Sequence, residues 1–195
     1  MELILDMNRR YTYADYLTWL DDKRRELING FIKMMSPAAT LSHARVVGRV
    51  YKCAINHIER NHGSCEVFTA PFDVRLPKNG EKEDNKIYTV VQPDIIVVCD
   101  HSKLEERGCL GAPDMVVEVL SPSTRKYDLH DKFTLYEASG VKEYWTIAPK
   151  DKDVTVFLLQ DDGKYNEGTL YTGNMKIPVQ SLPGLEMDTQ DLFAV

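Results

Sequence analysis

The sequence contains 195 residues, 43% of them hydrophobic and 28% charged, and its net charge at pH 7 is −6. This length suits one domain over residues 1–195, since domains commonly run to about 100–200 residues. The acidic balance argues against a protein that coats nucleic acid without sequence preference, and no apolar stretch approaches the ~18–20 residues that span a bilayer.

The N-terminus and the cysteines indicate the compartment. The apolar start of MELILDMNRRYTYADYL precedes its basic residues, the reverse of a secretory signal, so we expect a cytoplasmic protein. No pair among the four cysteines has CxxC spacing, which argues against a zinc site. We also expect no disulfide in an intracellular chain of this length.

The first elements are a short helix and a hairpin. The pattern predicts a helix over residues 13–20, with Thr12 as its cap and Asp15 completing a capping box. The dipeptide Asn29-Gly30 is a strong hairpin turn signal. Glu26 should therefore lie on a short strand just before a turn.

Residues 42–62 read as the longest helix, with Ser42 as its cap and Gly63 as its stop. Its apolar stripe at helical spacing consists of Val46, Val47, Val50, Tyr51, Ala54, Ile55 and Ile58. A neighbouring basic face carries Arg45, Arg49 and Lys52. That face is either a solvated surface or a contact for phosphates.

The centre of the chain alternates apolar strands with a helix. The runs VVQPDIIVVCD and APDMVVEVLS are typical of strands buried on both faces. A helix over residues 128–139 should end at Gly140, followed by strands in EYWTIA, DVTVFLL and KYNEGTLY. The tail adds an edge strand and a short helical turn. This order predicts an α/β (α+β) sandwich with a mixed central sheet flanked by helices.

Two carboxylates interrupt the apolar strands. Glu118 lies inside MVVEVLS, and Asp94 opens IIVVC directly after Pro93. A lone buried carboxylate is costly unless it is paired or bound to a metal. The pair suggests a shared site, although Asp94 could instead end a loop and Glu118 could pair with a cation for structure alone.

Lys132 favours the shared site. On a helix it lies about 40° from Tyr136, on the flank of the inward face. Its stem can follow the core and bring the ammonium to a buried carboxylate, although an ordinary snorkelling lysine is the alternative.

Three further residues have plausible structural roles. Asp73 could be a surface residue paired with Arg75. Asp114 shares a strand face with Glu118 and is a rival to Asp94, ranked second because it lies closer to the start of the strand. His43, at the start of the long helix, is more readily structural or exposed than catalytic.

The sequence resembles the Uma2 family of restriction-endonuclease-like proteins, in the PD-(D/E)xK superfamily. The resemblance covers nearly the whole chain and is most specific in GAPDMVVEVLSPSTRKYDLHDKFTLYEASGVKEYW, with further matches in ELINGFIKMMSP and VVQPDIIVVCD. It implies that Pro93-Asp94 supplies the PD motif and Glu118 the acid of the second motif. Leu120 stands where the superfamily has its lysine, so the lysine would come from the next helix as Lys132. Glu26 matches the early acidic residue.

The resemblance implies a restriction-endonuclease-like fold and an endonuclease that hydrolyses DNA with Mg²⁺ or Mn²⁺. Asp94, Glu118 and the carbonyl of Val119 would hold the cation. Lys132 would orient the attacking water and stabilise negative charge, with Glu26 as an auxiliary ligand and Tyr136 as a residue that orders the lysine or merely packs in the core. A homodimer is expected, since many endonucleases cut two strands with two subunits.

The chemistry agrees with these residue types. A hard cation polarises the phosphoryl oxygen and activates water, and Mg²⁺ needs only one or two carboxylates because it keeps several waters. Two alternatives stay open. The acidic charge and Leu120 suit a non-catalytic binding or dimerisation module with the nuclease fold, and the site chemistry also suits another phosphate ester.

Overall fold

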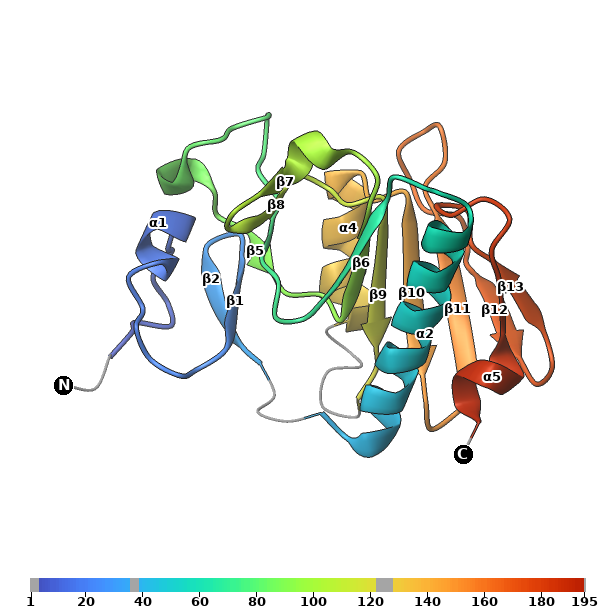
Figure 1. Ribbon diagram of the computed structural model, residues 1–195. Coiled ribbons are helices and arrows are strands. Elements are labelled where there is room, and N and C mark those ends of the chain that lie inside the picture. The colour runs from blue at the N-terminus through green and yellow to red at the C-terminus, as the bar shows by residue number, and fades with distance from the viewer. Residues whose placement is uncertain (1–3, 36–38, 122–127, 195) are drawn as a thin grey trace.

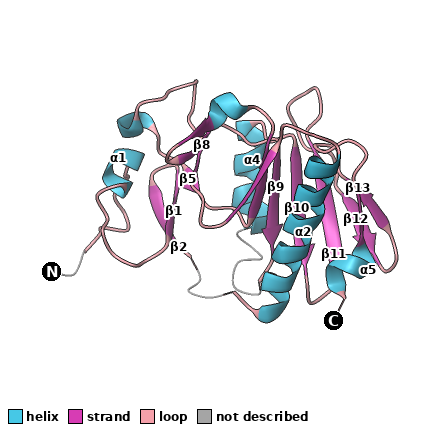
Figure 2. Ribbon diagram, in the orientation of Figure 1, coloured by secondary structure: helices cyan, strands magenta, loops and turns pink. Residues whose placement is uncertain are grey.

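Two mixed sheets form the framework of the protein in a computed structural model, which describes residues 4–35, 39–121 and 128–194 (Figures 1 and 2). The strand order of the first sheet is β2 (Phe31–Met34), β1 (Arg25–Ile28), β5 (Val90–Val91), β4 (Val74–Arg75), β8 (Gly108–Leu110) and β7 (Leu104–Glu105). The strand order of the second sheet is β12 (Thr169–Thr172), β11 (Asp153–Leu158), β10 (Glu143–Ala148), β9 (Met115–Val119), β6 (Ile95–Val98) and β3 (Glu66–Thr69). Strands β9 and β10 run parallel, as do β4 and β8, while the other neighbours are antiparallel.

Helices cover both faces of the second sheet. Helix α2 (Leu41–Arg60) lies along one face, and α4 (Phe133–Ser139) lies behind the other (Figure 1). Under α2, residues such as Val50 and Val117 form one apolar core, while Tyr136 on α4 packs with Val116 in a second core shared with Val91 of the first sheet. The fully buried β6 and β9 match the apolar runs that predicted them.

The N-terminal predictions are confirmed with shorter limits. Helix α1 (Tyr13–Tyr16) ends earlier than the predicted 13–20, but Thr12 and Asp15 form the expected capping box. Strands β1 and β2 form the hairpin around Asn29 and Gly30, both at positive φ.

Helix α2 begins one residue earlier than predicted. Thr40, not Ser42, is its cap, because the Thr40 hydroxyl accepts the N–H of His43. The helix ends at Arg60, and the N–H of Gly63 then bonds to the carbonyl of Ile58. No helix within the described ranges is long and apolar enough to cross a membrane.

The predicted helix 128–139 has two parts. Residues Asp128–Lys132 form a π-helical turn, η3, which leads into α4, and Gly140 ends the helix in the left-handed conformation at φ 82°. Such π turns are rare and are frequent at functional sites. Here Lys132 is the last residue of the π-helical turn.

The remaining elements are short. They comprise the 3₁₀ turns η1 (Asp84–Lys86) and η2 (His101–Lys103), the two-stranded sheet of β13 (Lys176–Pro178) and β14 (Glu186–Asp188), and helix α5 (Thr189–Phe193). The predicted strand in KYNEGTLY is mostly wrong, because β12 starts only at Thr169 and Tyr165 makes a single bridge to Leu159.

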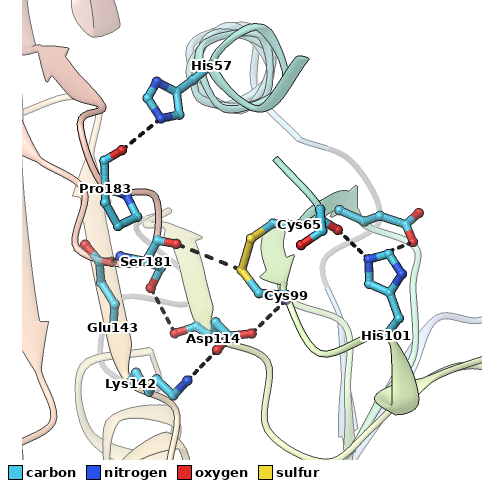
Figure 3. The surroundings of a disulfide bond; sticks show 11 residues. His57, Cys65, Cys99, His101, Asp114, Lys142, Glu143, Ser181 and Pro183 are labelled. Carbon is cyan, nitrogen blue, oxygen red and sulfur yellow. Dashed lines mark hydrogen bonds and ion pairs between the residues drawn. A yellow bond between two sulfur atoms is a disulfide. The ribbon is translucent and has the colours of Figure 1, made fainter. Parts of the chain in front are cut away.

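The expectation of no disulfide is wrong for one pair of cysteines. Cys65 and Cys99 are joined (Figure 3), whereas Cys53 and Cys109 are free. The β3–β6 ladder pairs Glu66 with Val98, so the two cysteines stand opposite each other one residue beyond its end. Their spacing of 34 residues in the sequence gives no sign of this pairing.

Candidate active site

A buried lysine links two buried glutamates where the two sheets meet. Lys132 Nζ lies 2.8 Å from Glu118 Oε1 and 3.2 Å from Glu26 Oε1. Lys132, Glu118 and Glu26 are 4%, 3% and 2% exposed. Glu26 comes from β1, Glu118 from β9 and Lys132 from the last position of η3. Three of the four residues expected at the site therefore lie in direct contact.

Strand alternation explains why these carboxylates point inward. Leu27 packs against the N-terminal aromatic residues, so Glu26 points to the opposite face of the first sheet. Val117 and Val119 pack under α2, so Glu118 points toward α4. Of the two arginines that precede Glu26 in the chain, Arg25 pairs with Asp21 and Arg24 bonds to Gln92.

Tyr136 takes part in the cluster through its hydroxyl group. It donates a 2.7 Å hydrogen bond to Glu118 Oε1, the oxygen that Lys132 also contacts. Burial raises the pKa of Tyr136 well above 10, and the nearby charges of Glu118 and Glu26 raise it further, so the phenol stays a proton donor. Tyr136 therefore does more than pack in the core, although its ring does pack on Tyr144.

Gln92 connects Glu26 to a second carboxylate. Its backbone N–H donates to Glu26 Oε1 at 2.9 Å, and its side-chain amide donates to Asp73 Oδ1 at 2.9 Å. Asp73 also accepts from the hydroxyl of Tyr13. Arg75, the alternative partner of Asp73, instead bonds to Glu105 at 2.7 Å. Sequence reasoning did not single out Gln92, which lies directly before Pro93-Asp94.

Asp94 lies beside the same end of β9. The β6–β9 register pairs Ile95 with Val117, so one step further Asp94 stands opposite Glu118. Asp94 Oδ2 accepts the N–H of Val119 at 2.7 Å, and Oδ1 lies 3.1 Å from His43 Nε2. His43 is therefore part of the site, and the structural reading that the sequence favoured missed this contact.

Leu120 lies two residues after Glu118, where the resemblance described above would place a lysine. The Leu120 N–H bonds to the carbonyl of Ile147 on β10, which continues the sheet. The ammonium at Glu118 comes instead from η3, in agreement with the predicted placement of Lys132.

Asp114 and Glu143 belong to the opposite end of the second sheet. Four residues of strand, about 13 Å, separate Asp114 from Glu118. Asp114 accepts from the N–H of Cys99 at 2.8 Å and from Lys142 Nζ at 2.7 Å (Figure 3). Burial tends to raise its pKa, but these two bonds outweigh burial and lower the pKa below its ordinary value. The buried Glu143, which the sequence did not single out, accepts N–H bonds from Trp145 and Ser181.

An open groove of about 620 Å³ starts at Asp94 and His43. It runs between α2, which contributes Val47 and Gly48 among others, and β3. Asp94 is the one carboxylate of the candidate site that lines this groove, which could receive part of a substrate.

The donor atoms at this end of β9 are oxygens. Within the described part of the chain, no group of three or more His, Cys, Asp or Glu side chains is arranged to hold a metal. Asp94 and Glu118 carry carboxylate oxygens, the kind of ligand that a hard cation such as Mg²⁺ prefers.

The two mixed sheets with helices on their faces form a nuclease-like α+β fold. The crystal structure of a protein described as "a putative nuclease belonging to DUF820", from Anabaena variabilis, superposes with a TM-score of 0.73. The two chains are 22% identical, and the match covers 94% of this chain and 98% of the other.

The chain belongs to the Uma2 family, described as "Putative restriction endonuclease", whose sequence profile matches residues 13–190. A relative from Synechocystis sp. (strain ATCC 27184 / PCC 6803 / Kazusa), named "Uncharacterized protein slr1290", is 27% identical over 154 residues. That match covers 77% of this chain and 75% of the relative.

Proposed function

We propose that this protein is a divalent-cation-dependent endonuclease that hydrolyses DNA. The observation that carries the proposal is the convergence of Glu26, Glu118 and Lys132, all buried, next to Asp94. Burying such charges costs free energy that an apolar core would avoid. The membership of a restriction-endonuclease family supplies the reaction class.

The proposed roles follow from the contacts. Asp94, Glu118 and the Val119 carbonyl would hold Mg²⁺ or Mn²⁺, which when bound supplies Lewis-acid polarisation of the phosphoryl oxygen. Lys132 would stabilise the negative charge that develops on phosphate oxygens. Tyr136 would hold Glu118 in place through its hydroxyl, and Gln92 would do the same for Glu26.

A second candidate is a non-catalytic binding module. One observation favours it: Glu26 and Glu118 already share the ammonium of Lys132, so one of their two negative charges is compensated without a metal. A cytoplasmic location and a homodimer remain predictions from the sequence.

Cleavage assays separate the two candidates. Purified protein is incubated with supercoiled plasmid, linear duplex and single-stranded DNA in Mg²⁺, Mn²⁺ or EDTA. We expect cleavage with either cation and none in EDTA. Glu118→Gln should abolish cleavage because it removes the carboxylate charge while keeping the shape of the side chain. Lys132→Met should also abolish it, since it keeps the stem and removes the ammonium.

Lys142→Met is the matched control. It removes a lysine from another carboxylate pair, with Asp114 at 2.7 Å, at the far end of β9. Its cleavage rate should equal that of the wild type, and melting curves would show which variants are folded. Absence of cleavage by the folded wild type under every metal condition would support the binding module, and full activity in Lys132→Met would remove the lysine from the mechanism.

A further inference from the structure

The groove beside Asp94 is hollow because small residues line it. Ala44 and Gly48 of α2 face Ala70 across it. A Cβ atom added at Gly48 would meet no heavy atom within 4 Å. The volume of about 620 Å³ lies within the range of roughly 300–1,000 Å³ that is usual for small-molecule sites.

Part of the groove lining is apolar and includes two aromatic side chains. Val47 from α2 and Val67 and Phe68 from β3 line it, together with Tyr51, which is 36% exposed. An aromatic residue beside an apolar surface is the kind of platform on which a nucleobase stacks. This apolar part of the groove lining therefore suits a flat, unpaired base.

Cations lie around the opening. Arg24 lines the groove itself. Arg45 and Lys52 are exposed and lie one turn before and one turn after Gly48 on the same helix, so they flank it on the surface. Although the chain as a whole is acidic at −6, this local positive charge is suited to binding a polyanion.

We propose that this groove holds an unpaired nucleotide of single-stranded DNA, with the base on Val47 and Tyr51 and the adjoining phosphate directed to Asp94. The cleavage part of this inference rests on the nuclease proposed above. A base in an intact duplex would have to leave its stack to reach the groove, at an energetic cost that a single strand avoids. The preferred substrate is therefore single-stranded DNA.

Binding measurements test the groove without depending on cleavage. Fluorescence anisotropy would compare a labelled single-stranded 20-mer with the same sequence as a duplex. The measurement uses wild-type protein in EDTA and the Glu118→Gln protein in Mg²⁺, in which the DNA should stay intact. We expect the single strand to bind more tightly.

Two pairs of variants locate the bound base. Gly48→Leu should fill the groove and weaken single-strand binding at least tenfold, while Gly48→Ala should bind like the wild type. Tyr51→Ala should weaken binding about five- to 150-fold through lost stacking, and Tyr51→Phe should retain it. All four proteins should melt cooperatively within a few degrees of the wild type, which shows that the fold is kept.

The outcomes for the two proposals are separate. Equal affinity for duplex and single strand, or unchanged binding in folded Gly48→Leu, would overturn the groove assignment even if the wild type cleaves DNA. Tight single-strand binding that depends on Gly48 and Tyr51 would support the groove assignment even if the wild type cleaves nothing, in which case the nuclease proposal fails.

Discussion

One ammonium group serves two carboxylates at the centre of the site. Lys132 contacts Glu118 and Glu26, while Tyr136 and the Gln92 N–H supply the neutral donors. With both acids ionised, this cluster carries a formal charge of −1, and Asp94 lies next to it. The excess negative charge is what a bound cation would neutralise, so the arrangement is suited to attracting one.

Asp114 gives a residue-level prediction about pH. Bonds from Lys142 and the Cys99 N–H hold its pKa below the ordinary value of 3.8. A carboxylate with a lowered pKa in the folded state adds stability above its ordinary pKa and loses this contribution as the pH falls through the folded value. Asp114→Asn should therefore be less stable than the wild type at pH 7, with a difference that shrinks below about pH 3.8.

Urea unfolding at a series of pH values measures this effect. Asp161→Asn, at an exposed turn residue, is the control and should follow the wild type throughout. A constant difference between Asp114→Asn and the wild type from pH 7 to pH 2 would show that the carboxylate charge is not the source of the stability.

Among individual residues, the sequence predicted those whose chemistry conflicts with their surroundings. Glu118 and Lys132 were recognisable because each is an ionisable group on an apolar face. His43 and Gln92 were not, because their roles depend on which atoms lie opposite them across strands and helices. That information lies in how the strands and helices pack against one another, which no local pattern in the sequence shows.

The disulfide between β3 and β6 is an element-level feature with a measurable contribution. It closes a loop across a sequence separation of 34 residues. A cross-link of this kind typically stabilises by about 2–4 kcal/mol, mainly by restricting the unfolded chain. Cys99→Ser should lower the free energy of unfolding by that amount, as measured by guanidinium titration.

Cys53→Ser is the matched control, since Cys53 is a free, half-buried thiol on α2. It should change stability far less. Dithiothreitol should reduce the stability of the wild type to that of Cys99→Ser and leave Cys99→Ser unchanged. If dithiothreitol does not change the free energy of unfolding of the wild type, the disulfide does not form in solution.

Among the elements, the sequence predicted those that carry their own periodicity. Helix α2, with its apolar stripe, was predicted nearly at its observed limits, and the buried strands β6 and β9 lie inside the longer apolar runs that predicted them. Strands such as β4 and β5 have two residues each. Two residues show no alternation, so such strands exist only because a partner pairs with them, and sequence patterns cannot reveal them.

At the scale of the whole molecule, the site joins the two sheets. Glu26 belongs to the first sheet and Glu118 to the second, and Lys132 bridges them. Removing one partner from a buried ion pair typically costs about 3–5 kcal/mol. Lys132→Met should lose stability in this range in EDTA, because two carboxylates then face each other without the ammonium.

Divalent cations should restore part of that loss. A ligand that binds only the folded protein stabilises it, so Mg²⁺ or Mn²⁺ should raise the melting temperature of Lys132→Met more than that of the wild type. Lys142→Met should respond like the wild type. Equal responses of Lys132→Met and the wild type would count against a cation site at Glu118.

The spread of the site along the chain has a consequence for synthesis. Glu26 lies near the start, Asp94 and Glu118 near the middle, and Tyr136 follows on α4. A growing chain that ends before Lys132 has the acids but no ammonium, and a fragment that begins after β1 lacks Glu26. If the protein cuts DNA as proposed, we therefore expect cleavage neither from a nascent chain that ends before Lys132 nor from a proteolytic fragment that begins after β1.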